Sequence, residues 1–466
     1  MGYRRRIRLI LVTVLIWSWG QVRADAATLY VNAATGNDST SRDSNSAEKP
    51  WATIGRAAWG SSNRQMPNQR EAAAAGDTVV IAAGIYATKG SGHRTEPAYN
   101  PVNSGALHRP ITFRAEGLVV LTLTESSGPV IGALSRNHIV WQGFTIREAD
   151  AKSRADTGPV VIWDSIGIVI DGNTVIGDPK LLPPDNHPGI RIERSKQITI
   201  RNNVVSGFRC SPPPNGVNPA NGAGIQLYTS DGIIIEHNEI SESGSGIFLK
   251  GMYHDDPPFR PADSYTIRYN LVHNVGTGMA FHVLPVRADS PVLVYQNVIR
   301  NSNLAVRIWP FGSHEREPRH VKFVNNTLVD NPVALFIGAA LVPDAGHIFQ
   351  NNIVVGASTA VMQVAGEFRS AQLDSRRNVY HAFSKFAIVG ESRNSIEPAS
   401  INANPLFTDA KANNFRLQAA SPARTAGLDV LDLDSDGGTT HAIPAGAYIK
   451  GTEVIGVDKT PAKRPF

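Results

Sequence analysis

The sequence predicts an all-β fold in which short parallel strands stack into a solenoid of about ten coils. Two observations predict it. A phrase of alternating apolar residues around an Asn recurs at intervals of roughly thirty residues. A second phrase, in which Gly introduces an alternating apolar segment, falls between its copies. Repeats of this length are typical of solenoids, in which each coil contacts only its neighbours.

The first phrase reads apolar-x-apolar-x-x-Asn-x-apolar, as in Ile198 to Val205. Alternation on both sides of the Asn predicts two short strands. Asn tolerates the left-handed backbone of a sharp bend, and stacked Asn side chains can form a hydrogen-bonded ladder. We therefore expect the bends and the ladder at positions 143, 173, 203, 238, 270, 297, 326, 352 and 378.

The second phrase predicts a third strand in each coil. Examples run from Gly189 to Glu193, Gly222 to Tyr228, Gly244 to Lys250 and Gly276 to His282. Propeller blades have longer repeats built from antiparallel hairpins, and leucine-rich repeats are dominated by Leu, so both fit less well. At about 4.8 Å per coil, ten coils give a rod about 50 Å long.

Residues 1–24 are predicted to be a secretory signal peptide. Four Arg residues precede the short apolar run Leu9 to Trp17, and small residues flank Arg23 at Val22 and Ala24. An uncleaved N-terminal anchor is the alternative. We expect a secreted or periplasmic protein with no membrane span after signal removal, a β-helix with its N-terminal cap over 25–400, and a C-terminal cap or tail over 401–466.

Charge and cysteine content narrow the partners. The pI near 9.2 depends on the leader, because five of the 45 basic residues lie in it and its removal leaves 40 basic against 40 acidic residues. A neutral mature chain argues against nucleic-acid binding.

Cys210 is the single cysteine, so no internal disulfide forms and the core must supply the stability. We expect a monomer.

The two ends of the mature chain carry a family resemblance. The start contains Leu29 to Asp38, Lys49 to Ile54 and Ala75 to Ile81, and the close contains Asn404 to Phe407 and Ala445 to Tyr448. These segments resemble secreted right-handed parallel β-helix proteins of the pectate-lyase-like (pectin-lyase-like) superfamily. In style they are most similar to the alginate and chondroitin lyases of polysaccharide lyase family six. The resemblance implies a right-handed solenoid with an N-terminal capping helix, which residues 54–75 fit.

Aligning the third strands on the Gly-Ile phrase places chemically active side chains in two outward columns. One column reads Asp164, Glu193, Tyr228, Lys250, His282 and Trp309, and the other reads Ile162, Arg191, Gln226, Phe248, Ala280 and Arg307. Aromatic faces, cations and carboxylates at this spacing suit an acidic polysaccharide lying along the rod. We therefore expect Arg191, Glu193, Tyr228, Gln226 and Trp309 to bind substrate.

Uronate β-elimination needs a neutralised carboxylate, a base for the C5 proton and an acid for the leaving oxygen. Lys250 is the candidate base, and Arg307 offers a planar fork for carboxylates. His282 and His254 are candidate proton donors or acceptors. A solvated lysine and loop-packing aromatic residues are the alternatives.

Two acidic loops are candidate calcium sites. Asp255 and Asp256 follow His254 and offer oxygen ligands for Ca²⁺, although an acidic turn fits equally. The stretch Asp432 to Gly437 matches the front of a calcium loop, but its twelfth position is Ile443 instead of Glu. A turn in the C-terminal segment is the favoured interpretation there.

Three functions remain open. The first is a lyase acting on a uronate-containing glycan, and the second is a non-catalytic glycan-binding or cell-envelope protein that uses the same columns. The third is a uronan C5-epimerase, of which only the His254–Asp256 part of an Asp-Pro-His-Asp motif is present. Fold alone does not separate them.

Overall fold

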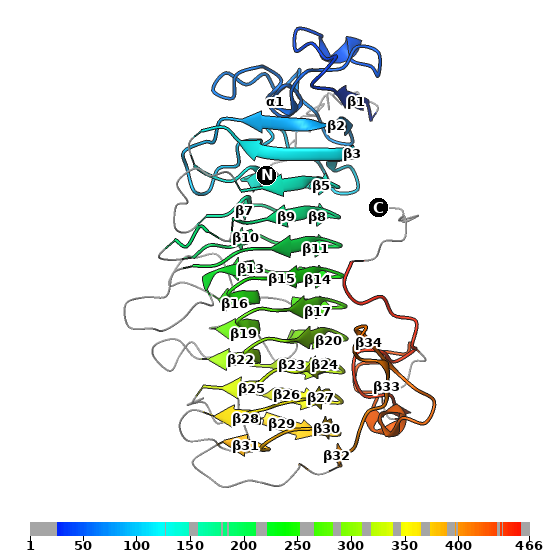
Figure 1. Ribbon diagram of the computed structural model, residues 1–466. Helices are drawn as coiled ribbons and strands as arrows, with labels where there is room; N and C mark the ends of the chain where they lie inside the picture. Colours follow the sequence, from blue (N-terminus) through cyan, green and yellow to red (C-terminus); the bar gives the residue numbers. More distant parts are fainter. Residues whose placement is uncertain are drawn as a thin grey trace, which may run out of the picture.

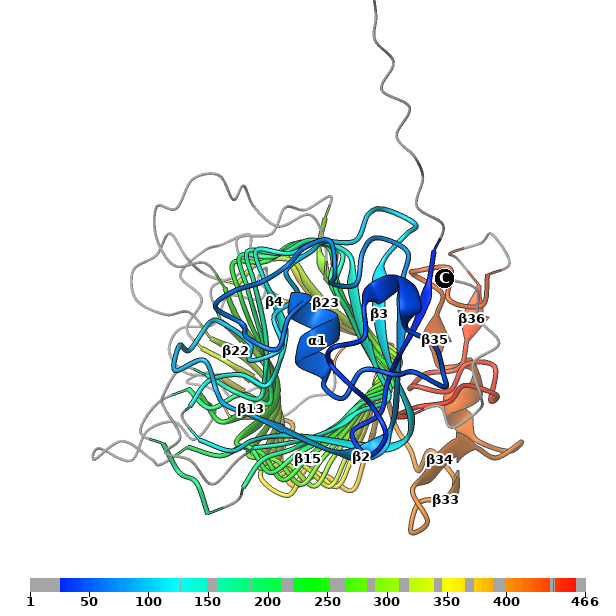
Figure 2. The same ribbon diagram turned by 90° about the horizontal axis from the view of Figure 1, so that it is seen from above.

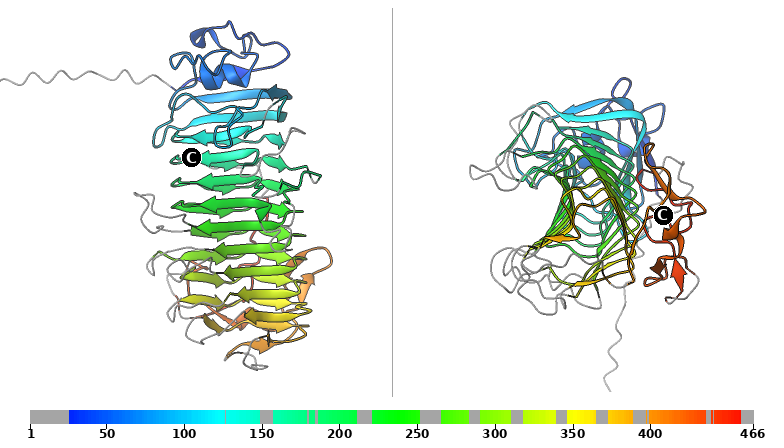
Figure 3. Two further views of the ribbon diagram at one scale, coloured as in Figure 1. Left: turned by 90° about the vertical axis from the view of Figure 1, so that its left-hand side faces the viewer. Right: turned by 60° about the horizontal axis from the view of Figure 1, so that its bottom comes forward.

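The computed structural model describes residues 26–125, 127–148, 157–178, 180–183, 186–210, 221–251, 265–282, 290–309, 318–338, 346–364, 373–388, 397, 399–435, 439 and 441–457. The prediction of an all-β parallel solenoid is confirmed, and Figures 1 and 3 show its coils stacked along one axis. The predicted signal peptide lies outside the described residues. Within them, no helix is long and apolar enough to cross a membrane.

One sheet carries the strands of the Gly-Ile phrase, and all its pairings are parallel. In the described part of the chain it has ten strands, which are β4 (Ile131–Leu134), β7 (Val160–Trp163), β10 (Ile190–Glu193), β13 (Ala223–Tyr228), β16 (Ser245–Gly251), β19 (Thr277–His282), β22 (Leu304–Trp309), β25 (Val333–Ile337), β28 (Ala360–Val364) and β31 (Ala387–Ile388).

The second sheet carries the strands on either side of the Asn. It opens with β1 (Thr28–Val31), β2 (Thr78–Thr88) and β3 (Ile111–Leu123) and reaches β32 (Ile401–Asn402). Between them lie the pairs β5 (Ile139–Gln142) and β6 (Thr145–Arg147), β8 (Val169–Asp171) and β9 (Thr174–Ile176), β11 (Thr199–Arg201) and β12 (Val204–Ser206), β14 (Ile233–Glu236) and β15 (Glu239–Ser241), β17 (Tyr265–Arg268) and β18 (Leu271–His273), β20 (Val292–Tyr295) and β21 (Val298–Arg300), β23 (Val321–Val324) and β24 (Thr327–Val329), β26 (His347–Gln350) and β27 (Ile353–Val355), and β29 (Leu373–Arg376) and β30 (Val379–His381).

The Asn ladder forms inside the bend between the paired strands. Asn270 donates from Nδ2 to the carbonyls of Ile235 and Arg268, both at 2.9 Å, and to Asn297 Oδ1 at 2.9 Å. The same contacts link Asn238 to Asn270, and the ladder runs from Asn173 to Asn378. These Asn side chains are buried, so they supply the hydrogen bonds that the bend's backbone would otherwise lack.

The expected position of the left-handed bend was correct at Gly143 and wrong by one residue at each ladder Asn. The positive φ angle falls on the residue before the ladder Asn, for example Tyr269 at 58° and Asn325 at 53°. In the first coil, Gly143 takes this left-handed place at 84°, and Phe144 stands where later coils have the Asn. The ladder therefore begins at Asn173, because Phe144 has no side-chain amide to extend it.

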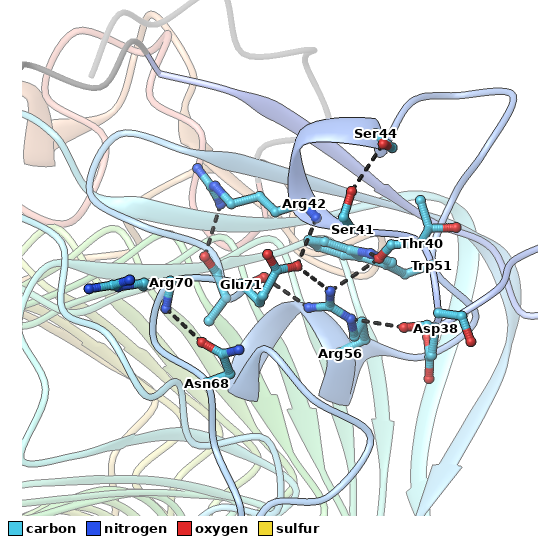
Figure 4. A network of polar contacts seen from close by, with 12 residues as sticks. Asp38, Thr40, Ser41, Arg42, Ser44, Trp51, Arg56, Asn68, Arg70 and Glu71 are labelled. Atoms are coloured by element: carbon cyan, nitrogen blue, oxygen red, sulfur yellow. Dashed lines mark hydrogen bonds and ion pairs between the residues drawn. The ribbon is translucent and has the colours of Figure 1, made fainter.

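The N-terminal helix is shorter than the 54–75 expected. Helix α1 spans Ile54–Trp59, begins where Thr53 Oγ1 accepts from Arg56 N, and ends at Gly60 with φ 71°. The following chain turns back instead, because Glu71 Oε2 accepts from the buried Arg56 guanidinium at 2.6 Å (Figure 4). Figure 2 shows α1 over the interior that the sheets enclose.

The C-terminal segment lies along the side of the solenoid, whereas a cap would cover its end (Figures 1 and 2). It contains the hairpins β33 (Phe407–Asp409) with β34 (Asn414–Leu417) and β35 (Gly427–Leu428) with β36 (Ala442–Ile443). Outward side chains of the bend anchor it. Asn351 Nδ2 donates to Leu428 O at 2.7 Å, and Asn325 Nδ2 donates to Pro444 O at 2.8 Å.

A buried histidine makes the stability of the fold depend on pH. His347 is 2% exposed, and burial first, then the charge of His320, lowers its pKa from 6.5 to about 4. The unfolded chain therefore binds a proton between these values that the folded chain does not, so stability falls as pH drops from 6.5 towards 4. We expect a loss of about 2 kcal/mol from this group by pH 5. Urea unfolding at pH 7.5 and pH 5 should show a smaller loss in His347→Gln than in the wild type, and equal losses would contradict the assignment.

Candidate functional site

The outward face of the ten-stranded sheet gathers polar and aromatic side chains between β7 and β25. The pairings align two outward positions of each strand with those of the next. One column contains Trp163, Glu193, Tyr228, His282 and Trp309, and the other contains Val161, Arg191, Gln226, Phe248, Ala280, Arg307 and Phe336. A register shift after Leu227 pairs Tyr228 with Gly251, so Lys250 lies next to the first column.

In the first coil, the predicted register of the columns was wrong by one residue. Trp163, not Asp164, pairs with Glu193, and Ile162 packs in the core. Asp164 lies in the following turn, where it forms an ion pair with Arg194. The run Val160 to Trp163 lacks polar alternation, so nothing in it fixed the inward side, and a one-residue slip exchanges the two faces of a strand.

Asn186 connects three residues of the face. Its Oδ1 atom accepts from Gln226 Nε2 at 3.1 Å, from Tyr228 OH at 3.0 Å and from Lys250 Nζ at 2.6 Å. Asn186 comes from the segment before β10 and is 6% exposed. This shared acceptor holds the Lys250 ammonium beside the Tyr228 ring, 5.4 Å from its centroid.

Arg191 and Glu193 form an ion pair on β10. Arg191 donates from Nε and NH2 to Glu193 Oε2 at 3.1 and 2.7 Å. The guanidinium also lies over the rings of Tyr228 and Trp163, at 4.6 and 5.5 Å. Burial raises the pKa of Glu193, and the charge of Arg191 opposes this. The guanidinium of Arg191 is thus already paired with the Glu193 carboxylate.

His282 lies between two cations. Burial, then the charges of Lys250 and Arg307, lowers its pKa to about 4. Its ring centroid is 5.8 Å from that of Phe248, over which the Lys250 ammonium also lies. The imidazole is therefore neutral at pH 7, the form in which a histidine can act as a base.

Arg307 rests on an aromatic platform. Its guanidinium is 4.7 Å from the Trp309 centroid and 5.8 Å from that of Phe336, and these two rings stack at 5.4 Å. Among the described residues, no carboxylate forms an ion pair with Arg307. Burial lowers its pKa, yet Arg remains charged in proteins. Lys250, His282 and Arg307 thus form an electropositive cluster, which we call the cationic site.

The structure places eight of the predicted site residues on this one face: Arg191, Glu193, Gln226, Tyr228, Lys250, His282, Arg307 and Trp309. His254, Asp255 and Asp256 lie outside the described residues. Sequence reasoning missed Trp163 and Phe336; it placed the loop of Asn186 as a wall on this side of the rod, without its contacts to the columns. Continuing the columns to β7 and β25 in the correct register finds the two aromatic residues, whereas no repeat pattern marks Asn186.

Comparison with known proteins identifies the fold family. The profile of the family described as "Right handed beta helix region" matches residues 141–328 and 191–375, which together span half of the chain. The chain belongs to this right-handed β-helix family. No curated protein matches the sequence.

Solved structures with this β-helix architecture are similar to the chain at low identity. The crystal structure of pectate lyase Pel9A is 15% identical, with a TM-score of 0.51 over 91% of this chain and 96% of that one. The complex of XylC with xylose is 13% identical (TM-score 0.45; 82% and 87% covered). The mannuronan C-5 epimerase AlgE6 A-module of Azotobacter vinelandii is 14% identical (TM-score 0.40; 71% and 91% covered). At these identities the likeness to Pel9A shows the fold alone.

Proposed function

We propose that this β-helix protein is a secreted polysaccharide lyase that cleaves a uronate-containing glycan by β-elimination at the cationic site. One observation carries the proposal: the imidazole of His282 lies against the same Phe248 ring as the Lys250 ammonium, on the strand paired with that of Arg307. Burial and these two charges lower the pKa of His282. A uronate carboxylate would be drawn to the two cations, and a neutral imidazole beside them could take a proton from the adjacent carbon.

The roles follow from the contacts. Arg307 binds the carboxylate with its planar fork, and Lys250, positioned by Asn186, neutralises the charge that develops on it. His282 removes the C5 proton, the C4–O bond breaks as the double bond forms, and the imidazolium returns the proton to the leaving oxygen. The sequence favoured Lys250 as the base; here that role is given to His282, whose pKa is lowered by burial first and then by the charges of Lys250 and Arg307. Tyr228, Gln226 and Trp309, with the Arg191–Glu193 pair, line the remaining sugar positions.

Glycan binding without catalysis is the second candidate. The stacked Trp309 and Phe336 rings with Arg307 favour it, because such a platform binds sugar faces whether or not chemistry follows. That function predicts retention on a polysaccharide gel that Trp309→Ala abolishes and His282→Gln leaves intact.

The test is incubation of the mature protein with pectate, alginate and chondroitin while ultraviolet absorbance is followed. A lyase gives a rising absorbance from the unsaturated product. Unchanged absorbance on all three polymers would contradict the proposal, and altered uronate composition without cleavage would indicate an epimerase. The calcium role of Asp255 and Asp256 stays a prediction, for which EDTA should lower the rate and added Ca²⁺ restore it.

A further inference from the structure

The hairpin of β35 and β36 carries a polar cluster away from the cationic site. The hairpin is held to the solenoid by Asn351, whose side chain donates to Leu428 O at 2.7 Å and accepts from Leu428 N at 3.1 Å. Next to the two strands, the carbonyl of His441 accepts a hydrogen bond from Asp429 N at 2.9 Å. Asp429 and His441 therefore face each other at the base of the loop.

Three side chains of this loop converge. Ligand atoms of Asp429, Asp434 and His441 all lie within 4.8 Å of one another. His441 Nε2 is 2.8 Å from Asp434 Oδ2. The Asp434 and His441 side chains are 26% and 38% exposed, so the cluster opens to solvent on one side. Water and ions can thus reach it.

Asp429 has a carboxylate oxygen for which the described chain provides no partner. Its residue is fully buried, and its Oδ1 accepts from the backbone N–H groups of Leu431 and Leu433 at 3.2 and 3.1 Å. Its Oδ2 is buried without a hydrogen bond. An unsatisfied buried carboxylate oxygen is costly, and natural proteins satisfy such groups with a hydrogen bond or a cation.

We propose that Asp429, Asp434 and His441 bind a divalent transition-metal cation of the Zn²⁺ type. Carboxylate oxygens and an imidazole nitrogen are both ligands of Zn²⁺, so the three side chains can fill three of its usual four positions and water can fill the fourth. Calcium prefers oxygen ligands alone, and the calcium-loop match of the sequence began at Asp432, which is not one of the three. Because His441 is one of the three ligands, we expect a metal of the Zn²⁺ type where the loop sequence indicated Ca²⁺.

The site would fasten the C-terminal segment. Asp429 and His441 flank the two strands of the hairpin, so a shared cation joins the ends of the loop and holds the hairpin in the form that docks on Asn351. A cation that binds the folded loop and not the unfolded one raises the stability of the folded form. This role is structural and independent of the proposed lyase reaction.

The experiment uses the untagged mature chain, stripped of metal with a chelator and titrated with ZnCl₂ by calorimetry. We expect one Zn²⁺ per chain and a rise in the melting temperature on loading. Asp429→Asn, which keeps the shape of the side chain, and His441→Gln should each weaken Zn²⁺ binding at least tenfold. His273→Gln is the matched control, because it removes another His–carboxylate pair, that of His273 with Glu239 in the second sheet, and should bind Zn²⁺ like the wild type.

Three results would overturn the proposal. One is the absence of a stoichiometric Zn²⁺ site in the wild type, and another is equal loss of binding in the His273→Gln control. The third is a site that binds Ca²⁺ and rejects Zn²⁺. Because binding and melting are read without any polysaccharide, failure here is separate from failure of the lyase assay.

Discussion

In the His282→Gln variant, kcat for uronate elimination should fall by about 10²- to 10⁴-fold, the range that a positioned general base contributes. Glutamine can still form hydrogen bonds beside Phe248, so the fold and the substrate contacts of Arg307 are expected to persist. KM should therefore change little. Steady-state rates of product absorbance across substrate concentrations measure both constants.

The pH profile separates a chemical role of His282 from a structural one. With a pKa of about 4, the imidazole of the free enzyme is already protonated below that value and cannot act as a base, so kcat/KM should rise with pH through about 4 and stay level above it. This acidic limb should disappear in His282→Gln.

Lys250→Met should instead raise KM, with Lys322→Met in the second sheet as its control. A profile that titrates on the alkaline side and vanishes in Lys250→Met would assign the base to Lys250.

Replacing Asn270 by Ala should destabilise the protein by about 4 kcal/mol or more. The two N–H groups of its Nδ2, which three acceptors share, and the two hydrogen bonds that its Oδ1 accepts from Asn238 disappear together. Each buried group left without a partner costs about 1–3 kcal/mol, and whole domains are stable by only about 5–15 kcal/mol. The midpoint of urea unfolding, followed by circular dichroism, measures the loss.

The matched control for this substitution is Asn303→Ala. Asn303 is exposed, and no hydrogen bond of its side chain is among those of the described residues, so its loss should cost less than about 0.5 kcal/mol. If both variants unfolded at the same urea concentration, the ladder would not stabilise the fold as argued. An equal effect of Asn238→Ala, one coil away, would support it.

The periodic part of this fold was predictable from sequence, because every coil repeats the same physical solution. The Asn and Gly-Ile phrases mark strands and bends where the side-chain alternation is strong, and this placed Lys250, His282 and Arg307 on one face. The prediction failed where the alternation is absent. At Val160 to Trp163 all the side chains are apolar, so the register slipped by one residue.

Contacts between segments of unrelated pattern could not be predicted. Asn186 reaches Lys250 from outside the repeat, and its role depends on the path of an irregular segment. The Asp429–Asp434–His441 cluster likewise arises because a hairpin returns the chain to its own start. Sequence spacing gives no measure of such closures, so the Asp residues of the loop indicate calcium and nothing in the spacing points to His441.

The C-terminal segment changes how the stack can open. In a plain solenoid each coil holds only its two neighbours, so fraying can start at any weak coil and spread. Here one strip of chain is bonded to Asn351, Asn325, Gln296 and Tyr269, which occupy the same bend in four consecutive coils. No one of these coils can separate from the next without also breaking the contacts of this strip. The four coils should therefore unfold cooperatively, as a single unit.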